Sequence, residues 1–211
     1  MNRYLAEFTG VFFWMLTLGC VSIAPGAGTI PAVAIGGVVA IVTVLCWNVS
    51  GAHLNPAVSV MMWRRGLLPV KDLTPYVVFQ FLGAGAGAAV VKVLKRGQGA
   101  GTLQSVFMPT FFAELLFTLL LCFAFLYLFH NREKFSLMAT GGLIGGVVMV
   151  GIFAVGAVSG ALFNPATTVG SCLLGLLSFK NLLIYWLAQA VAVFVVAYAW
   201  GRMNLAVATK S

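Results

Sequence analysis

The sequence has few charged residues and very few acidic ones. Charged residues make up 8% of its 211 residues, and hydrophobic residues make up 62%. A soluble globular domain has about 25% charged and about 45–50% apolar residues. This composition excludes an ordinary cytosolic enzyme and a disordered regulatory protein. Twelve Lys and Arg stand against four acids, which are Glu7, Asp72, Glu114 and Glu133.

The sequence also lacks the clusters that metal sites and active sites need. Its two His, four Cys and four acids do not gather at one depth of the apolar segments, so we expect no metal, no cofactor and no enzyme activity. The net charge of +8 does not indicate a nucleic-acid partner, because the basic residues stand mostly at the edges of apolar runs. The cysteines lie inside such runs, which is typical of packed thiols. They are Cys20, Cys46, Cys122 and Cys172.

Six apolar segments are long enough to cross a membrane, which takes roughly 20 residues. They cover about 4–24, 29–47, 74–93, 108–129, 136–157 and 182–202. Two further apolar stretches, at 55–67 and 164–177, reach only roughly 18–20 Å, against a hydrocarbon core of about 30 Å. We therefore predict an all-α integral membrane protein in which residues 1–211 form a single membrane domain. It has six transmembrane helices and two re-entrant half-helices.

The two halves of the chain resemble each other. When residues 35–60 are shifted by 109 positions, 13 of the 26 positions match residues 144–169, with glycines, a proline and an asparagine in register. Each half, about 1–97 and about 106–205, contains three predicted spans, and a loop at about 94–107 joins them. An odd number of spans turns the second half upside down relative to the first. Such inverted repeats place their site near the middle of the bilayer.

Each predicted half-helix begins with the tripeptide Asn-Pro-Ala. Asn is a preferred N-cap, and Pro is favoured at the first helical position. A helix N-terminus leaves backbone N–H groups unpaired and carries about +0.5 of an elementary charge. The inverted repeat brings the two N-termini together, where they repel cations and protons while the Asn amides offer donors. The residues are Asn55, Pro56, Ala57, Asn164, Pro165 and Ala166.

The distribution of Lys and Arg predicts that both termini face the cytoplasm. With the N-terminus inside, eight basic residues fall on the inner side and four on the outer side, and inner loops usually carry the excess. The basic cluster at 92–96 opposes this orientation. We expect the protein in a cell membrane, either a plasma membrane or a bacterial inner membrane.

The segments "SGAHLNPAVS" and "SGALFNPATT" resemble the paired signature of the aquaporin, or major intrinsic protein, family. The resemblance covers essentially the whole chain. It implies a homotetramer in the lipid bilayer with one pore per subunit, and passive flow of water or small neutral solutes without a cofactor. It also implies that Glu7 and Glu114 are structural acids, which accept hydrogen bonds from the loops that lead into the half-helices. His53 is expected to organise the inner mouth of the pore.

The sequence departs from the family pattern at the outer constriction. Most members of the family follow the second Asn-Pro-Ala with Arg, and here that position is Thr167. The other three constriction positions of the family fall on Ile35, Ile152 and Ala161. Because Arg brings a fixed charge and several donors, its absence predicts a wider and more apolar opening. We therefore expect relaxed selectivity, with water and solutes such as ammonia, hydrogen peroxide and urea as permeants.

The sequence is also compatible with two other functions. An apolar constriction can stay dewetted, which would make the protein a closed-pore structural or junctional membrane protein. Inverted repeats with broken helices also occur in secondary transporters, which often carry a titratable residue at the midplane. Absence of water flux would favour the first alternative, and saturable or ion-coupled uptake would favour the second.

Overall fold

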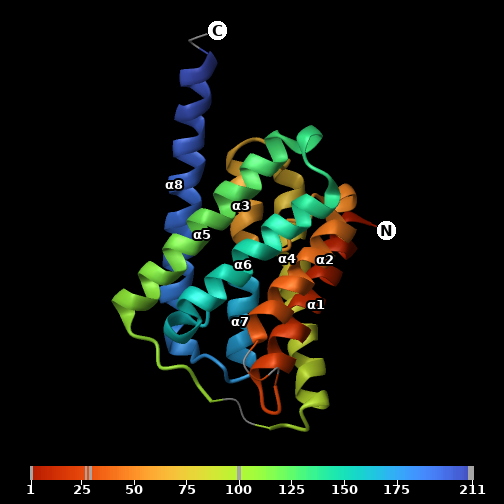
Figure 1. Ribbon diagram of the computed structural model, residues 1–211, viewed down its shortest axis with the longest axis vertical. Coiled ribbons are helices and arrows are strands. Elements are labelled where there is room, and N and C mark those ends of the chain that lie inside the picture. The colour runs from red at the N-terminus through yellow and green to blue at the C-terminus, as the bar shows by residue number, and fades with distance from the viewer. Residues whose placement is uncertain (1, 27, 29, 99–100, 209–211) are drawn as a thin grey trace.

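The computed structural model describes residues 2–26, 28, 30–98 and 101–208, and this part of the chain folds as a bundle of helices (Figure 1). Six helices are long and apolar enough to cross a membrane. They are α1 (Arg3–Ser22), α2 (Pro31–Ser50), α4 (Val70–Leu94), α5 (Phe107–His130), α6 (Leu137–Ser159) and α8 (Leu182–Ala208). Two short helices, α3 (Pro56–Arg64) and α7 (Pro165–Leu173), occupy the places of the predicted half-helices. The predicted fold class is confirmed.

The half-helices are shorter than predicted, with nine residues each. The apolar stretches that predicted them continue to 67 and 177, but the chain turns back earlier. Gly66 follows α3 with a φ of +70°, and Gly175 follows α7 with a φ of +75°. Glycine adopts this left-handed conformation without the steric cost that a Cβ brings. The two turns lie 109 positions apart, so the repeat includes the places where the half-helices end.

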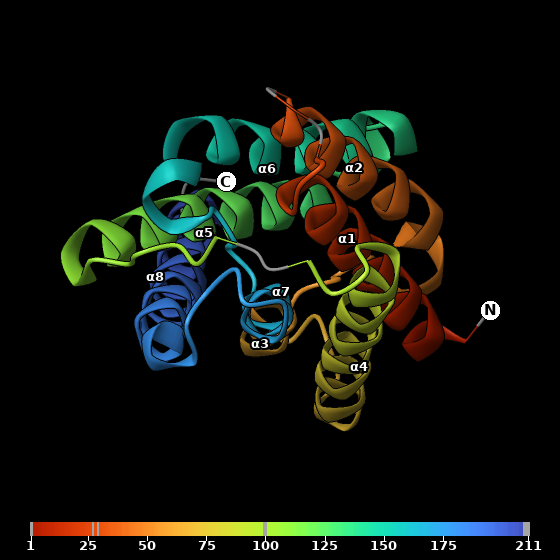
Figure 2. The ribbon, with the colours of Figure 1, turned by 90° about the horizontal axis from the view of Figure 1, so that it is seen from below.

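The two half-helices meet end to end in the middle of the bundle. In Figure 1, α3 lies above α7, and in Figure 2, seen from below, the two overlap between α4 and α8. Helices α1, α2, α5 and α6 lie on the other side of this pair (Figure 2). The N-termini of α3 and α7 therefore point at each other inside the protein.

Close approach of α2 and α6 depends on two glycines at one crossing. A Cβ on Gly36 would meet the carbonyl oxygen of Gly145 at 2.8 Å, and a Cβ on Gly145 would collide with the carbonyl of Gly36. Gly87 has the same role between α4 and α1, where a Cβ would meet the carbonyl of Phe12 at 2.8 Å. The neighbouring Gly37 has nothing within 4 Å of such an atom. Small residues let helices approach closely in a membrane protein, and here Gly36, Gly145 and Gly87 have that role while Gly37 does not.

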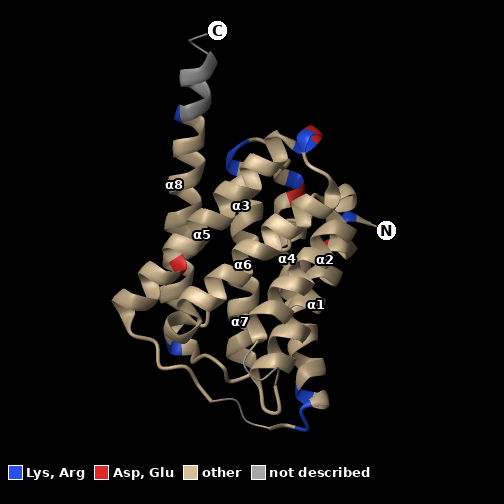
Figure 3. Ribbon diagram, viewed as in Figure 1, with Lys and Arg blue, Asp and Glu red and all other residues tan. Residues whose placement is uncertain are grey.

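Charged residues lie mainly at the two ends of the bundle. Figure 3 shows the Lys and Arg there, with none at mid-height. At the end where α1 begins, Arg3 Nη1 contacts Asp72 Oδ2 at 2.9 Å, and the hydroxyl of Tyr4 donates to Asp72 Oδ1 at 2.7 Å. This ion pair joins the first turns of α1 and α4. Two further acids, Glu7 and Glu114, are buried inside the bundle and belong to the candidate functional site.

Candidate functional site

The site is built on the two Asn residues that cap the half-helices. Asn55 Oδ1 accepts the backbone N–H of Ala57 at 2.9 Å, and Asn164 Oδ1 accepts that of Ala166 at 2.9 Å. In both helices Pro occupies the first helical position. This is the arrangement expected from N-cap preferences, because Pro lacks the N–H that would otherwise stay unpaired there.

The amide groups of the two Asn residues cross-link the half-helices. Asn55 Nδ2 donates to the carbonyl of Phe163 at 2.9 Å, and Asn164 Nδ2 donates to the carbonyl of Leu54 at 2.9 Å. Each carbonyl belongs to the residue immediately before the other Asn. An amide NH₂ has two donors, and the second donor of each Asn has no partner in the described part of the chain. That second donor is therefore available for a hydrogen bond to another molecule.

A buried carboxylate holds the loop that leads into α3. Both oxygens of Glu7 are used: Oε1 accepts the N–H of His53 at 3.0 Å and the hydroxyl of Ser50. Oε2 accepts the N–H of Leu54 at 2.6 Å and the side-chain amide of Gln80 at 2.7 Å. A fully buried acid is costly in a membrane protein unless it is paired inside the structure. Four donors from three parts of the chain satisfy this one.

Glu114 holds the loop before α7 in the same way. Its Oε1 accepts the hydroxyl of Ser159 at 2.8 Å and the N–H of Leu162 at 3.0 Å. Its Oε2 accepts the N–H of Phe163 at 2.8 Å and the side-chain amide of Gln189 at 3.0 Å. Every partner lies 109 positions after its counterpart around Glu7. Both glutamates thus accept the loop hydrogen bonds that the resemblance implies, and their role as structural acids of the site stays a prediction.

These loops hold residues in a conformation that is unusual without glycine. Ala52 and Leu54 have φ values of 48°, and Ala161 and Phe163 have φ values of 54° and 48°. Non-glycine residues rarely adopt positive φ, and they do so where the surrounding structure holds them. The carboxylate accepts the N–H of Leu54 in one loop and that of Phe163 in the other. This backbone conformation places the carbonyl of Leu54 beside Asn164 and the carbonyl of Phe163 beside Asn55.

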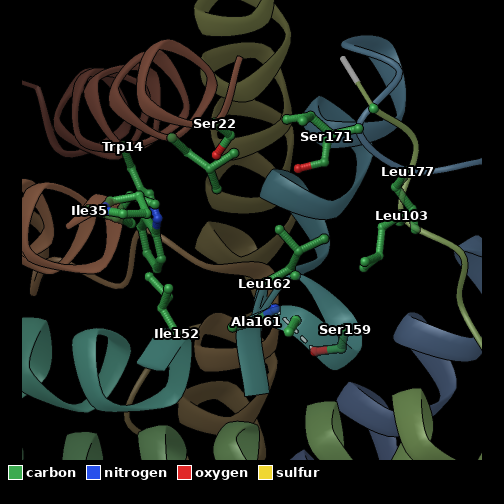
Figure 4. A pocket seen from close by; sticks show the side chains of 17 residues that line it. Trp14, Ser22, Ile35, Leu103, Ile152, Ser159, Ala161, Leu162, Ser171 and Leu177 are labelled. Atoms are coloured by element: carbon green, nitrogen blue, oxygen red, sulfur yellow. Dashed lines mark hydrogen bonds between the residues drawn. The ribbon is translucent and has the colours of Figure 1, made fainter. Parts of the chain in front are cut away.

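A cavity of about 380 Å³ lies on the side of the half-helices where Gly101 and Leu103 contribute to its lining (Figure 4). None of the 17 residues that line it, all of them in the described part of the chain, is charged. Leu103 forms a parallel bridge with Leu177, and both side chains line the cavity. Leu162 also lines the cavity, so all three of these leucines contribute apolar surface to it.

Three of the four predicted constriction residues line this cavity. Ile35 comes from α2, Ile152 from α6, and Ala161 from the loop before α7 (Figure 4). Thr167 is not among the lining residues. It is fully buried, and its hydroxyl donates to the carbonyl of Asn164 at 3.2 Å. Ser171, one turn further along α7, lines the cavity instead, and its hydroxyl has no partner among the described residues.

A second, much smaller void of about 10 Å³ lies on the other side of the Asn pair, beside His53 and Asn55. That is about the space that one water molecule occupies. The lining of this void corresponds to that of the cavity through the internal repeat. Each of the three constriction residues that line the cavity has a counterpart, 109 positions away in the sequence, that lines the void. The pairs are Ile35 and Ile144, Ile152 and Thr43, and Ala161 and Ala52. The linings of the two spaces are therefore related by the internal repeat, and the term lumen denotes the two spaces together.

His53 lies at the wall of the small void, and it is buried. Its Nδ1 is 3.1 Å from the hydroxyl of Ser59, and its ring packs on Tyr76 and Phe125. A separate space of about 450 Å³ is lined by residues from the ends of α2, α5 and α6 and from the segments beside them. They are Trp47, Asn48, Gly51, Phe129, Arg132, Glu133, Phe135 and Leu137. His130, in contrast, lies against Trp200 of α8 and does not line that space.

Sequence reasoning missed three kinds of site residue. The Gln residues that donate to Glu7 and Glu114, and two matching Tyr residues, were visible only as repeat matches. Tyr76 donates to the carbonyl of Ser50, as Tyr185 does to that of Ser159. Ser171 had no signal beyond its place one turn after Thr167. Trp14 lies seven residues after Glu7, on the face of α1 that a buried acid marks as inward. That spacing would have identified it as a lumen candidate.

Six membrane-spanning helices and two opposed, Asn-capped half-helices around an uncharged lumen define a polytopic membrane protein of the channel type. A family model described as "Major intrinsic protein" matches residues 1–143 and 104–201. The chain belongs to the major intrinsic protein family. Members of this family are channels for water and small solutes and are not enzymes. No group of three or more His, Cys, Asp or Glu in the described residues is arranged to hold a metal ion.

Individual relatives agree with this assignment. The chain is 31% identical to Aquaporin NIP1-4 of Oryza sativa subsp. japonica, over 97% of this chain and 78% of that protein. It is 32% identical to Aquaporin Z of Brucella melitensis biotype 1, over 95% of this chain and 96% of that protein. The fold is similar to the X-ray structure of the aquaglyceroporin from Plasmodium falciparum, with a TM-score of 0.81 and 21% identity over 99% of this chain and 98% of that one.

Proposed function

We propose that this protein conducts water together with small neutral solutes such as ammonia, hydrogen peroxide and urea, and that it excludes cations and protons. The observation that carries the proposal is the pair of reciprocal hydrogen bonds between Asn55 and Asn164 and the opposite loops, each 2.9 Å long. They hold two helix N-termini against one lumen, and both present positive partial charge to it. A cation would lose hydration there and meet donors only.

Relaxed selectivity follows from the walls of the outer cavity. Ile35, Ile152 and Ala161 line it, and no charged side chain does. Without an Arg, nothing fixed at the outer wall replaces the hydration of a charged or strongly polar solute. A neutral solute loses less on entry, so the apolar wall discriminates weakly between water and molecules of similar size.

The assembly and the orientation belong to the same proposal. We infer a homotetramer with one lumen in each subunit, and an orientation with both termini in the cytoplasm of a cell membrane. Two inverted halves, about 1–97 and 106–205, each contribute one half-helix. The matching hydrogen bonds around Glu7 and Glu114 support this division. Cross-linking in native membranes and protease protection of tagged termini test the assembly and the orientation.

Stopped-flow light scattering on proteoliposomes tests the function. Vesicles with the purified protein are mixed with an impermeant osmolyte, then with urea or an ammonium gradient, beside protein-free vesicles. Shrinkage and solute entry faster than in the protein-free vesicles are expected. Water flux without solute flux would overturn the relaxed selectivity. No flux from a folded protein would favour the closed-pore structural alternative, and saturable uptake would favour a transporter.

The role of Thr167 has its own test. If Thr167 belongs to the constriction, Thr167→Arg narrows the solute range without abolishing water flux. Thr167→Val, which keeps the volume and removes the bond to the carbonyl of Asn164, is the matched control for loss of the hydroxyl. An unchanged solute profile in Thr167→Arg would place Thr167 outside the constriction, in line with its absence from the cavity wall.

A further inference from the structure

Trp14 stands at the junction of the two halves of the lumen. It lines both the cavity of about 380 Å³ and the void of about 10 Å³, and no other described residue lines both. It extends from the middle of α1 and is 3% exposed. Leu18 and Ser22, at intervals of four residues on the same helix, line the larger cavity only. Anything that moves from one space to the other therefore passes the indole of Trp14.

The bulk of Trp14 breaks the symmetry of the lumen. Glu7 and Glu114 are 107 positions apart, and the same offset relates Trp14 to Leu121 of α5, which lines the small void. The predicted constriction residues that line the cavity are aliphatic, so none of them supplies a large rigid group. In Figure 4, Trp14 reaches in from α1 beside Ile35, above Ile152. The large aromatic ring that lines the cavity therefore comes from α1, whereas α2 and α6 contribute the aliphatic side chains of Ile35 and Ile152.

The helix that carries Trp14 is fixed on both sides of it. Gly10 allows α1 to contact the loop before α3, where a Cβ would come within 2.9 Å of Leu54 Cδ1. Met15 packs on Gly170 of α7, where a Cβ would lie 3.0 Å from Met15 Cγ. Both contacts join α1 to the re-entrant elements. The indole thus cannot withdraw by a shift of α1 without moving the half-helices.

The indole also brings a hydrogen-bond donor. Nε1–H of Trp is a donor only, and this one donates to no other residue in the described part of the chain. Unpaired hydroxyls occur in both spaces that Trp14 lines: that of Ser171 in the larger cavity and that of Thr43 in the small void. An ammonium ion has no lone pair for such a donor, whereas water, urea and hydrogen peroxide have.

We propose that Trp14 sets the size limit of the lumen, because it supplies the bulk that the aliphatic side chains of Ile35 on α2 and Ile152 on α6 do not. The proposal rests on the proposed function, because it concerns which neutral solutes pass. The permeants are then molecules small enough to slide past one indole and able to accept a hydrogen bond from it. Ile35, Ile152 and Ala161 form the wall against which the solute passes.

The test compares the ratio of urea to water permeability in proteoliposomes of the wild type and of Trp14→Leu, which inserts the residue that stands at the pseudo-symmetric position 121. The ratio is expected to rise by about tenfold, equivalent to about 1.4 kcal/mol off the barrier for urea relative to water. Trp200→Leu is the control, because Trp200 is a buried indole that lines neither space. It should leave the ratio unchanged.

The outcomes separate this inference from the proposed function. If the wild type conducts water and a folded Trp14→Leu variant keeps the wild-type ratio of urea to water permeability, the inference about Trp14 is wrong and the proposed channel function still holds. If the wild type conducts nothing, the proposed function fails, and the inference then stands only if Trp14→Leu opens a water flux. If Trp14→Leu does not fold, Trp14→Phe takes its place. A smaller rise in the ratio supports the inference, and an unchanged ratio overturns it.

Discussion

Asn55 and Asn164 each donate to the carbonyl of the residue that precedes the other, so neither half-helix can leave the midplane without breaking both bonds. Each Asn residue therefore caps a helix and joins the two halves of the chain, and under the proposed function it also presents a donor to the lumen. Substitutions that keep one task and remove another can separate them.

Asn164→Asp keeps the cap and removes the donors. The carboxylate still accepts the N–H of Ala166, but the carbonyl of Leu54 loses its partner, at a cost of about 1–3 kcal/mol. The new negative charge offsets the positive helix N-terminus at the lumen. We expect a folded protein with increased proton leak, measured with a pH-sensitive dye trapped in proteoliposomes. Asn181→Asp adds the same charge outside the lumen, and an equal leak from that variant would contradict the explanation.

Glu7→Gln places an amide nitrogen where two oxygens now accept four bonds. Whichever way the amide points, at least two buried donors lose their acceptor, so we expect a loss of about 2–6 kcal/mol in the free energy of unfolding. The thermal midpoint in detergent measures it. Glu133→Gln removes an acid whose side chain is 91% exposed, and its effect should stay within about 0.5 kcal/mol. Equal midpoints for the two variants would show that Glu7 does not hold the loop.

Gly145→Ala is expected to destabilise the protein by about 1–3 kcal/mol, because the added methyl group collides with the carbonyl of Gly36 and separates α2 from α6. Gly146→Ala is the matched control. Nothing lies within 4 Å of its added methyl, and Ala is favoured over Gly in a helix by up to about 1 kcal/mol. The two thermal midpoints should move in opposite directions. A fall for both variants would place a neighbouring subunit or lipid against Gly146.

Ser171→Ala removes an unpaired hydroxyl from the wall of the outer cavity. Because that hydroxyl has no partner within the described chain, its loss should leave stability unchanged or slightly raised. Water that hydrogen-bonds to it on the way through should pass about two- to fivefold more slowly, as expected for about 0.5–1 kcal/mol of lost interaction. Stopped-flow measurements beside Ser178→Ala, outside the cavity, check this. Unchanged water flux in Ser171→Ala would mean that the hydroxyl does not contact the permeating file.

Much of the fold was predictable because it follows from local rules. The length of an apolar run decides whether a segment can span a bilayer, and Asn-Pro marks where a helix begins. The helix boundaries differed by a few residues: α4 begins at Val70 and not at about 74, and both half-helices end before the glycine turns. Boundaries depend on where the backbone turns, and a continuous apolar stretch does not mark that point.

The candidate site was predictable where it follows the repeat and unpredictable where it depends on side-chain direction. Ile35, Ile152 and Ala161, which the family resemblance places at the constriction, line the cavity. Thr167 points into the protein, because a short hydroxyl side chain near a helix N-terminus can bond back to the carbonyl of the N-cap residue. The roles of all four in selectivity, and the division at about 94–107, stay predictions.

The sequence by itself determined the number of spans, the two half-helices and their inverted relation, since each depends on composition and spacing along the chain. Only the tertiary structure decided what fills the lumen. Trp14 and Ser171 lie 157 positions apart in the sequence and no local pattern relates them, yet both line one cavity. Which side chains converge on a lumen depends on helix rotation and on close approach at glycine crossings. Those are properties of the packed bundle and not of any single segment.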